Sequence, residues 1–151
     1  MKSSLPKVLH RLAGRALLHH VIGAAAGLEP RHVVVITGHG ATEVEAYCRD
    51  EEKAGATFDV IFVRQEPQLG TGHAMQQAVP VLPDDGITLV LNGDVPLVRP
   101  EALRQLVALC ADRQLALLTV DTGVDAGAYG RIVRSAGSAV APGDSAVRAI
   151  V

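Results

Sequence analysis

The sequence predicts an α/β protein whose sheet is open and mostly parallel, with helices on both faces. Two observations lead to this fold class. Short β-branched runs without polar alternation occur along the chain, which is typical of strands covered on both faces. Segments with helical spacing of apolar residues separate these runs, which favours right-handed crossovers between parallel strands. With 151 residues that are 48% hydrophobic, the chain can bury one core, so a single domain is expected.

The first third of the chain supplies a loop, a helix and a strand. Residues 1–14 are predicted as a loop or short strand, because a proline and a glycine interrupt them. Apolar residues over 16–26 follow the spacing of one helix face, and Gly27 stands where a C-terminal cap is common. The run His32–Thr37 predicts the first buried strand.

The middle of the chain repeats this alternation. Thr42 and Glu45 have the spacing of a capping box, which predicts a helix that extends to about Ala54. A short buried strand is expected over 59–63, followed by a loop and a helix over 71–79.

The last third begins in the same way and then changes. Residues 87–92 and 115–120 are apolar runs that predict two further buried strands. Between them, a proline opens a helix that is expected over 100–112. Beyond this point, residues 131–134 and 146–151 are short strand candidates that indicate a hairpin-like excursion.

Composition excludes several classes of protein. Fourteen basic and sixteen acidic residues give a net charge of −2, without the basic stripe of a nucleic-acid binder. Cys48 and Cys110 lack metal-ligand spacing, so buried thiols in a reducing compartment are expected. The apolar runs are too short for stable insertion into a membrane, and no signal peptide is recognisable. A cytoplasmic enzyme or binding domain fits these observations.

The first candidate site follows the apolar run that ends at Asn92. Gly93 and Asp94 come directly after this run, and Pro96 prevents its continuation. Ligands of open α/β sheets collect beyond the carboxyl ends of strands, and Mg²⁺ typically takes one or two protein carboxylates. The segment alone leaves open the alternative that Asp94 only turns the chain or caps the following helix.

The second candidate site opens the helix expected over 71–79. Gly70 and Gly72 flank Thr71, so backbone N–H groups at this helix start can face a ligand. Gln65 adds an amide that can donate and accept, as recognition of a pyrimidine edge requires. An ordinary capped helix start is the alternative, with His73 as a surface or packing residue rather than a ligand.

Four stretches make the sequence resemble a known family. They are Leu5–His10 (LPKVLH), Gln68–Ala74 (QLGTGHA), Gly93–Leu97 (GDVPL) and Tyr129–Ile132 (YGRI). Their order and spacing are similar to those of the bacterial bifunctional N-acetylglucosamine-1-phosphate uridyltransferase and glucosamine-1-phosphate acetyltransferase family, over essentially the whole chain. The resemblance implies a Rossmann-like nucleotidyltransferase domain that converts UTP and N-acetylglucosamine 1-phosphate into UDP-N-acetylglucosamine and pyrophosphate for cell-wall synthesis. It also implies that full-length relatives are homo-oligomers.

The resemblance assigns roles to eight residues. Lys7 would contact phosphate; Gln65, Gly70 and Thr71 would bind uracil; Asn92 and Gly93 would lie at the nucleotide sugar; Asp94 would ligate Mg²⁺ there; and Gly130 would contact the acetamido sugar. Lys7 and Asp94 would be the catalytic residues. From the sequence alone, a lysine after a proline is an ordinary solvated surface residue.

The sequence also departs from the family pattern. Asn92 stands where many relatives have an aromatic residue, so hydrogen bonds are expected in place of stacking. Met1 aligns with the last residue of the family's glycine-rich loop, and Val151 precedes a glutamate of the sugar pocket and a second metal ligand. We therefore expect residues 1–151 to be a partial domain without the first strand, that loop and the acetyltransferase β-helix domain. Because the first strand would lie between 33–37 and 87–92, this chain is expected to be inactive and poorly folded alone.

Two further readings remain open. In the first, the chain is a non-catalytic remnant with partial affinity for nucleotide sugars, or a piece of a longer reading frame. In the second, it is a nucleotidyltransferase for another nucleoside triphosphate or sugar phosphate, because related enzymes share the architecture.

Overall fold

The computed structural model describes residues 5–52, 59–110, 115–123, 127, 130–134 and 147–150, in two compact units, Met1–Leu117 and Leu118–Val151. In chain order the first unit contains η1 (Lys7–Leu9), β1 (Arg11–Leu12), β2 (Arg15–Ala16), α1 (Leu17–Ala26), β3 (His32–Thr37), α2 (Ala41–Glu52), β4 (Asp59–Arg64), α3 (Thr71–Ala78), η2 (Val79–Val81) and α4 (Pro100–Ala108). The second unit contains β5 (Ile132–Arg134) and β6 (Val147–Ile150).

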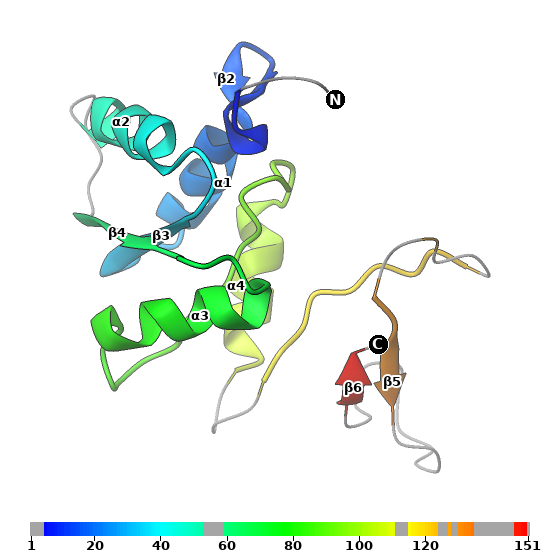
Figure 1. Cartoon of the computed structure of the whole chain (residues 1–151). Coiled ribbons are helices and arrows are strands. Elements are labelled where there is room, and N and C mark those ends of the chain that lie inside the picture. The colour runs from blue at the N-terminus through cyan, green and yellow to red at the C-terminus, as the bar shows by residue number, and fades with distance from the viewer. Residues whose placement is uncertain are drawn as a thin grey trace. The chain divides into compact units, whose positions relative to one another are not determined.

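A parallel pair of strands organises the first unit. β3 and β4 pair in register from His32 opposite Asp59 to Thr37 opposite Arg64. The N–H of Gln65 donates to the carbonyl of Thr37 at 2.7 Å, which extends the ladder by one residue. Helices α2 and α3 cover opposite sides of this pair (Figure 1). The expected α/β class, with parallel pairing and helices on both faces, is confirmed.

The core of the first unit connects η1 and α1 with β3 and α2. Its buried members are Leu9, Ala16, Leu18, Val35, Val44 and Cys48. Ala16 and Cys48 are small, and Val35 and Val44 are β-branched, so two helices can pack closely on the strand. Cys48 is buried, Cys110 is partly buried, and neither forms a disulfide, so the prediction of a buried thiol is confirmed fully at Cys48 alone.

The N-terminal segment is more ordered than expected. η1 is followed by a two-residue hairpin, in which Arg11 pairs with Ala16 and Leu12 with Arg15. The turn residues Ala13 and Gly14 both have positive φ, at 50° and 83°, as a tight hairpin with right-handed twist requires.

The capping box at the start of α2 is a wrong prediction. The helix already begins at Ala41, and the N–H of Val44 donates to the carbonyl of Gly40 at 3.1 Å, so Thr42 lies inside the first turn. Glu45 does not reach back to cap the helix, because Arg64 and Thr37 donate to its carboxylate instead. The expected end of this helix at Ala54 lies outside the described residues.

The other helices agree with the sequence except at their ends. α1 ends at Ala26 as expected, but Gly27 has a right-handed φ of −63° rather than the left-handed conformation of many glycine caps. α3 ends at Ala78, because the chain tightens into η2 around a proline. α4 begins with Pro100 as predicted and ends at Ala108.

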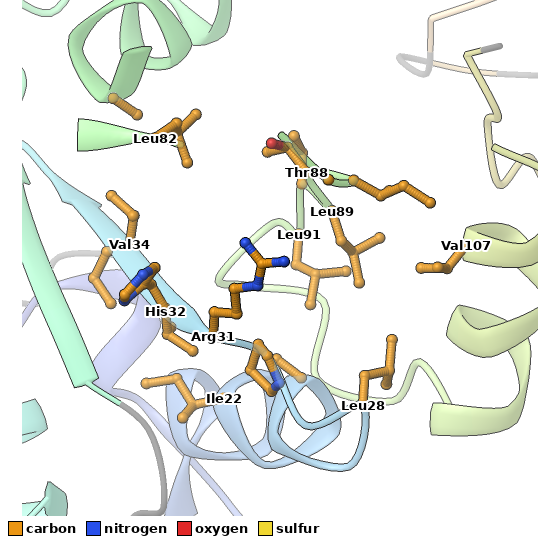
Figure 2. A pocket seen from close by; sticks show the side chains of 18 of the residues that line it. Ile22, Leu28, Arg31, His32, Val34, Leu82, Thr88, Leu89, Leu91 and Val107 are labelled. Carbon is orange, nitrogen blue, oxygen red and sulfur yellow. The ribbon is translucent and has the colours of Figure 1, made fainter. Parts of the chain in front are cut away.

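Two predicted strands are wrong. Residues 87–92 and 115–120 have no ladder with any described residue. An apolar groove of about 970 Å³ separates residues 87–91 from β3. Figure 2 shows His32 and Val34 across this groove from Thr88, Leu89 and Leu91. An apolar run becomes a strand only when a partner's N–H and C=O groups come within reach, and β3 does not reach residues 87–91.

The second unit is a hairpin, as predicted. β5 and β6 are antiparallel, with Ile132 opposite Ile150 and an irregularity between Val133 and Arg134. None of the helices in the described ranges combines the length and apolar character needed to cross a bilayer.

Candidate active site

The predicted catalytic residues Lys7 and Asp94 form an ion pair. Lys7 Nζ donates to Asp94 Oδ2 at 2.6 Å. The hydrogen bond and charge of Asp94 raise the pKa of Lys7, and the hydrogen bond from Lys7 lowers the pKa of Asp94 against a smaller opposing effect of burial. Both groups are therefore charged at neutral pH. The Lys7 side chain is 76% exposed and that of Asp94 34%, so solvent and ligands can reach both.

Two glycines hold η1, and with it Lys7, in place. A Cβ on Gly93 would lie 3.2 Å from Val8 Cγ1, so this glycine lets η1 approach the turn that carries Asp94. Gly40, at φ 68°, contacts Pro6 so closely that a Cβ there would overlap the proline ring. Lys7 thus follows a proline that is packed against the protein, and its position is fixed by neighbours on both sides.

Asp94 lies in a turn and not at a helix start. The N–H of Val95 donates to the carbonyl of Asn92 at 3.1 Å, which closes a turn around Gly93 and Asp94. α4 begins at Pro100 and its N-cap residue is Arg99, so the alternative that Asp94 caps this helix is wrong. The turn aims the carboxylate at η1.

The predicted base-binding residues also lie together. Gln65 Nε2 donates to the carbonyl of Gly70 at 2.8 Å. Gly70 has φ 97°, a conformation that glycine adopts without strain, and it directly precedes α3. None of the side chains in the described part of the chain caps α3, so the first N–H groups of this helix, beginning with that of Thr71, are available as donors.

The sequence did not predict the ion pair that Arg64, the neighbour of Gln65, forms with Glu45. Arg64 donates to Glu45 through Nε at 2.8 Å and Nη2 at 3.0 Å, and Thr37 Oγ1 donates to the same carboxylate at 3.3 Å. The Glu45 side chain is only 7% exposed, and the hydrogen bond from Arg64 lowers its pKa despite burial. The signal in the sequence is an acid beside Val44 on the buried face of a helix, where a charge needs a partner.

The loop after β3 touches both groups of residues. A Cβ on Gly38 would lie 2.8 Å from Gln68 Nε2, in the loop between Gln65 and Gly70, while Gly40 contacts Pro6. A cavity of about 240 Å³ opens here, lined by Thr37, Gly38, Ala41, Arg64, Gln65, Glu66, Pro67 and Gln68. It lies at the carboxyl ends of β3 and β4, where α/β proteins bind ligands.

Seven of the eight predicted site residues thus belong to the first unit. Gly130 belongs to the second unit and is exposed. Only Arg131 separates it from the start of β5. Of the eight predicted site residues, only Gly93 lines the large apolar groove beside β3. The other residues that line this groove are mostly aliphatic, and they include no pair of predicted catalytic groups.

A divalent cation bound at this site would be held by the carboxylate of Asp94. Among the described residues, no three His, Cys, Asp or Glu side chains converge on a common metal position. A single carboxylate fits Mg²⁺, which completes its coordination with water and substrate phosphates. It does not fit a structural zinc site, which needs four protein ligands.

The chain is similar to one protein family and to several individual proteins. A family model described as MobA-like NTP transferase domain matches residues 1–149. The bifunctional protein GlmU of Polaromonas naphthalenivorans is 63% identical over 151 residues, which are 100% of this chain and 31% of that protein. The bifunctional protein GlmU of Acidovorax ebreus is 63% identical over 140 residues, 93% of this chain and 29% of that protein. That of Marinobacter nauticus is 52% identical over 135 residues, 89% of this chain and 28% of the relative. The chain therefore spans less than a third of the length of these relatives.

Proposed function

We propose, from the premise that this chain belongs to the MobA-like NTP transferase family, that it carries the nucleotide-binding part of a uridyltransferase. The reaction transfers uridylyl from UTP to N-acetylglucosamine 1-phosphate and releases pyrophosphate. The product, UDP-N-acetylglucosamine, is a cytoplasmic precursor for the cell wall. The observation that carries the proposal is the ion pair of Lys7 with Asp94, because it joins two of the four family motifs at one place.

Lys7 and Asp94 are proposed to act on the phosphates. The sugar phosphate attacks the α-phosphorus of UTP in line, so catalysis depends on positioning and charge neutralisation rather than on a covalent protein intermediate. The charged and exposed Lys7 ammonium can turn from Asp94 to a phosphate oxygen. Asp94 would hold Mg²⁺, which neutralises phosphate charge when bound.

Gln65, Gly70 and Thr71 are proposed to bind the uracil. The uracil edge presents two carbonyl acceptors on either side of one N–H donor. The uncapped N-terminus of α3 offers backbone donors, and the Gln65 amide lies beside it, in hydrogen-bond contact with Gly70. Donors and an acceptor are therefore available within one short segment.

The sugar is assigned to the remaining residues. Asn92 and Gly93 form the turn next to Asp94, so they can contact the nucleotide sugar where it joins the phosphates. The Asn92 amide supplies hydrogen bonds in place of the aromatic stacking found in many relatives. Gly130 is proposed to contact the acetamido group through its backbone.

One observation favours a second candidate, nucleotide-sugar binding without turnover. Residues 87–92, which lead to Asp94, have no ladder partner among the described residues. A catalytic carboxylate needs a rigid support, because a misplacement of about 1 Å can cost about 10²-fold in rate. If residues 1–151 alone keep this arrangement, they would bind ligand but turn it over poorly.

The test uses a chimera, in which residues 1–151 replace the matching stretch of the Polaromonas naphthalenivorans relative. Pyrophosphate release is measured with UTP, N-acetylglucosamine 1-phosphate and Mg²⁺, with the unaltered relative as the positive control. We expect release that requires both substrates. A folded chimera without any release would contradict the proposed function, whereas release from the chimera but not from residues 1–151 alone would support the second candidate for the isolated chain.

A further inference from the structure

A chain of hydrogen-bonding groups lies behind the Gln65 amide. Gln65 Nε2 is 2.8 Å from the carbonyl oxygen of Gly70 and 3.1 Å from Nδ1 of His73. On the other side of the imidazole ring, Nε2 of the Gln77 amide is 3.1 Å from Nε2 of His73. His73 and Gln77 are one turn apart on α3, and both are partly buried.

The Gly70 carbonyl determines the direction of every hydrogen bond in this chain. A carbonyl oxygen only accepts, so the Gln65 group that faces it must be the NH₂. The same NH₂ faces His73, so Nδ1 accepts and the proton of the neutral ring lies on Nε2. Two N–H groups cannot bond to each other, so the Gln77 amide must be turned by 180°, with its oxygen in the place of the nitrogen that faces the ring.

This arrangement leaves the Gln65 oxygen for a ligand. Both N–H groups of the amide are engaged, and Oε1 accepts no hydrogen bond from any residue in the described part of the chain. Gln65 lines the cavity at the carboxyl ends of β3 and β4. The amide therefore offers an acceptor and no donor at this position.

We infer that His73 and Gln77 are positioning residues that set the choice between uracil and cytosine by fixing the Gln65 amide. This inference rests on the proposed function and deepens it. Uracil carries an N–H at N3, which can donate to Oε1, whereas N3 of cytosine is an acceptor and would meet Oε1 without a hydrogen. A site whose polar groups are left unpaired rejects the wrong ligand strongly.

His73 contributes what Gly70 alone cannot. Gly70 is an exposed loop residue, and one hydrogen bond leaves an amide able to rotate about its last bond. The second contact comes from a residue inside α3, and Gln77 fixes the tautomer of that residue. Without the Nδ1 acceptor, the amide could turn over and present its NH₂ to N3 of cytosine.

A matched pair of variants at His73 tests this inference in the chimera. The side chains of asparagine and leucine have the same branched shape, but only asparagine can place an acceptor where Nδ1 was. The readout is the ratio of kcat/KM for UTP to that for CTP, measured by pyrophosphate release. Because both nucleotides are measured on one preparation, a change in the folded fraction cancels.

We expect His73→Leu to lower this ratio by about five- to tenfold, the usual weight of one neutral hydrogen bond. The fall should come from a lower kcat/KM for UTP, with the value for CTP equal or higher. His73→Asn should restore the ratio to within about twofold of the parent, because the acceptor is back in place.

A second pair at Gln77 tests the tautomer step. Gln77→Glu keeps an acceptor for the Nε2 proton and should leave the ratio nearly unchanged. The methionine of Gln77→Met has a similar length but no strong acceptor. We expect this variant to lower the UTP-to-CTP ratio by less than His73→Leu does.

The outcomes separate the inference from the proposed function. A UTP preference that survives His73→Leu, or equal losses for UTP and CTP in that variant, would overturn the role of His73. A folded chimera that releases no pyrophosphate from UTP would overturn the proposed function, and the inference with it.

Discussion

Lys7 Nζ lies 2.6 Å from Asp94 Oδ2, although the two residues are 87 positions apart in the sequence. The contact brings η1 and the turn after residues 87–92 to one place, and it exists because Gly93 admits Val8 at close range. The protein thus places a cation and an anion side by side where phosphates and a divalent cation are proposed to bind. Both charges would exchange a protein partner for a ligand when substrate arrives.

The first prediction concerns the Asp94 carboxylate. In the chimera, Asp94→Asn should keep the fold but lower Mg²⁺-dependent pyrophosphate release by on the order of 10² or more, since the loss of one such electrostatic contact typically costs about 3 kcal/mol. Asp85→Asn, which breaks an exposed ion pair with Arg31, is the matched control and should leave turnover unchanged. Turnover of Asp94→Asn close to that of the parent would exclude Asp94 as a metal ligand.

The second prediction concerns the ion pair itself and needs no turnover. Because the hydrogen bond from Lys7 is the largest cause of the lowered pKa of Asp94, Lys7→Met should raise that pKa toward its ordinary value. NMR titration of the side-chain carboxyl carbons measures this shift in residues 1–151. Arg31→Met is the control, and it should leave the Asp94 titration where it was. An Asp94 pKa that does not respond to Lys7→Met would show that the pair does not form in solution.

The third prediction concerns the buried Glu45. Its pKa is lowered in the folded protein, chiefly by the hydrogen bond from Arg64, so the folded state binds fewer protons than the unfolded state. The stabilisation is therefore fully present above the ordinary value of 4.5 and is lost as the pH falls through the lowered folded value. Thermal unfolding should show Glu45→Gln to be less stable than the parent at neutral pH. The difference should shrink in acid, and a constant difference across this range would contradict the assignment.

The fourth prediction concerns residues 87–91. Ile87 and Val90 are 52% and 59% exposed, and this segment has no ladder partner among the described residues. Its amides should exchange with solvent much faster than those of β3, where Val35 is buried in the core. Hydrogen exchange by NMR on residues 1–151 compares the two. Equal protection would show that this segment is paired in solution.

The sequence was sufficient for elements that local patterns determine. β3 and β4 were located because β-branched runs bounded by breakers form strands when a parallel partner lies beside them, and α1 and α4 because apolar spacing marks one helix face. Residues 87–92 and 115–120 carry the same kind of pattern, yet they form no ladder here. Pairing depends on a neighbour far away in the chain, which a local pattern does not contain.

In the candidate site, too, the sequence predicted some features, and others depend on contacts between distant parts of the chain. The motifs located Lys7, Gly70 and Asp94, and the family pattern added Gln65. The structure places these residues in two groups joined by the loop after β3. The partners of Glu45 were not predictable from its spacing to Thr42, since Arg64 reaches it only through the register of β3 and β4. The direction of the Gln65 amide likewise depends on a backbone carbonyl and a helix neighbour, which only the folded chain brings together.

The most direct test of a uracil-binding site is the nucleotide preference of the chimera and of its Gln65→Ala variant. Pyrophosphate release is measured with UTP and with CTP at equal concentrations, in the presence of N-acetylglucosamine 1-phosphate. The chimera should use UTP at least about tenfold better than CTP, and Gln65→Ala should remove most of this preference, because the acceptor for the uracil N–H is lost. Equal use of both nucleotides by the parent chimera would contradict the account and would indicate a nucleotidyltransferase with a different nucleoside triphosphate as substrate.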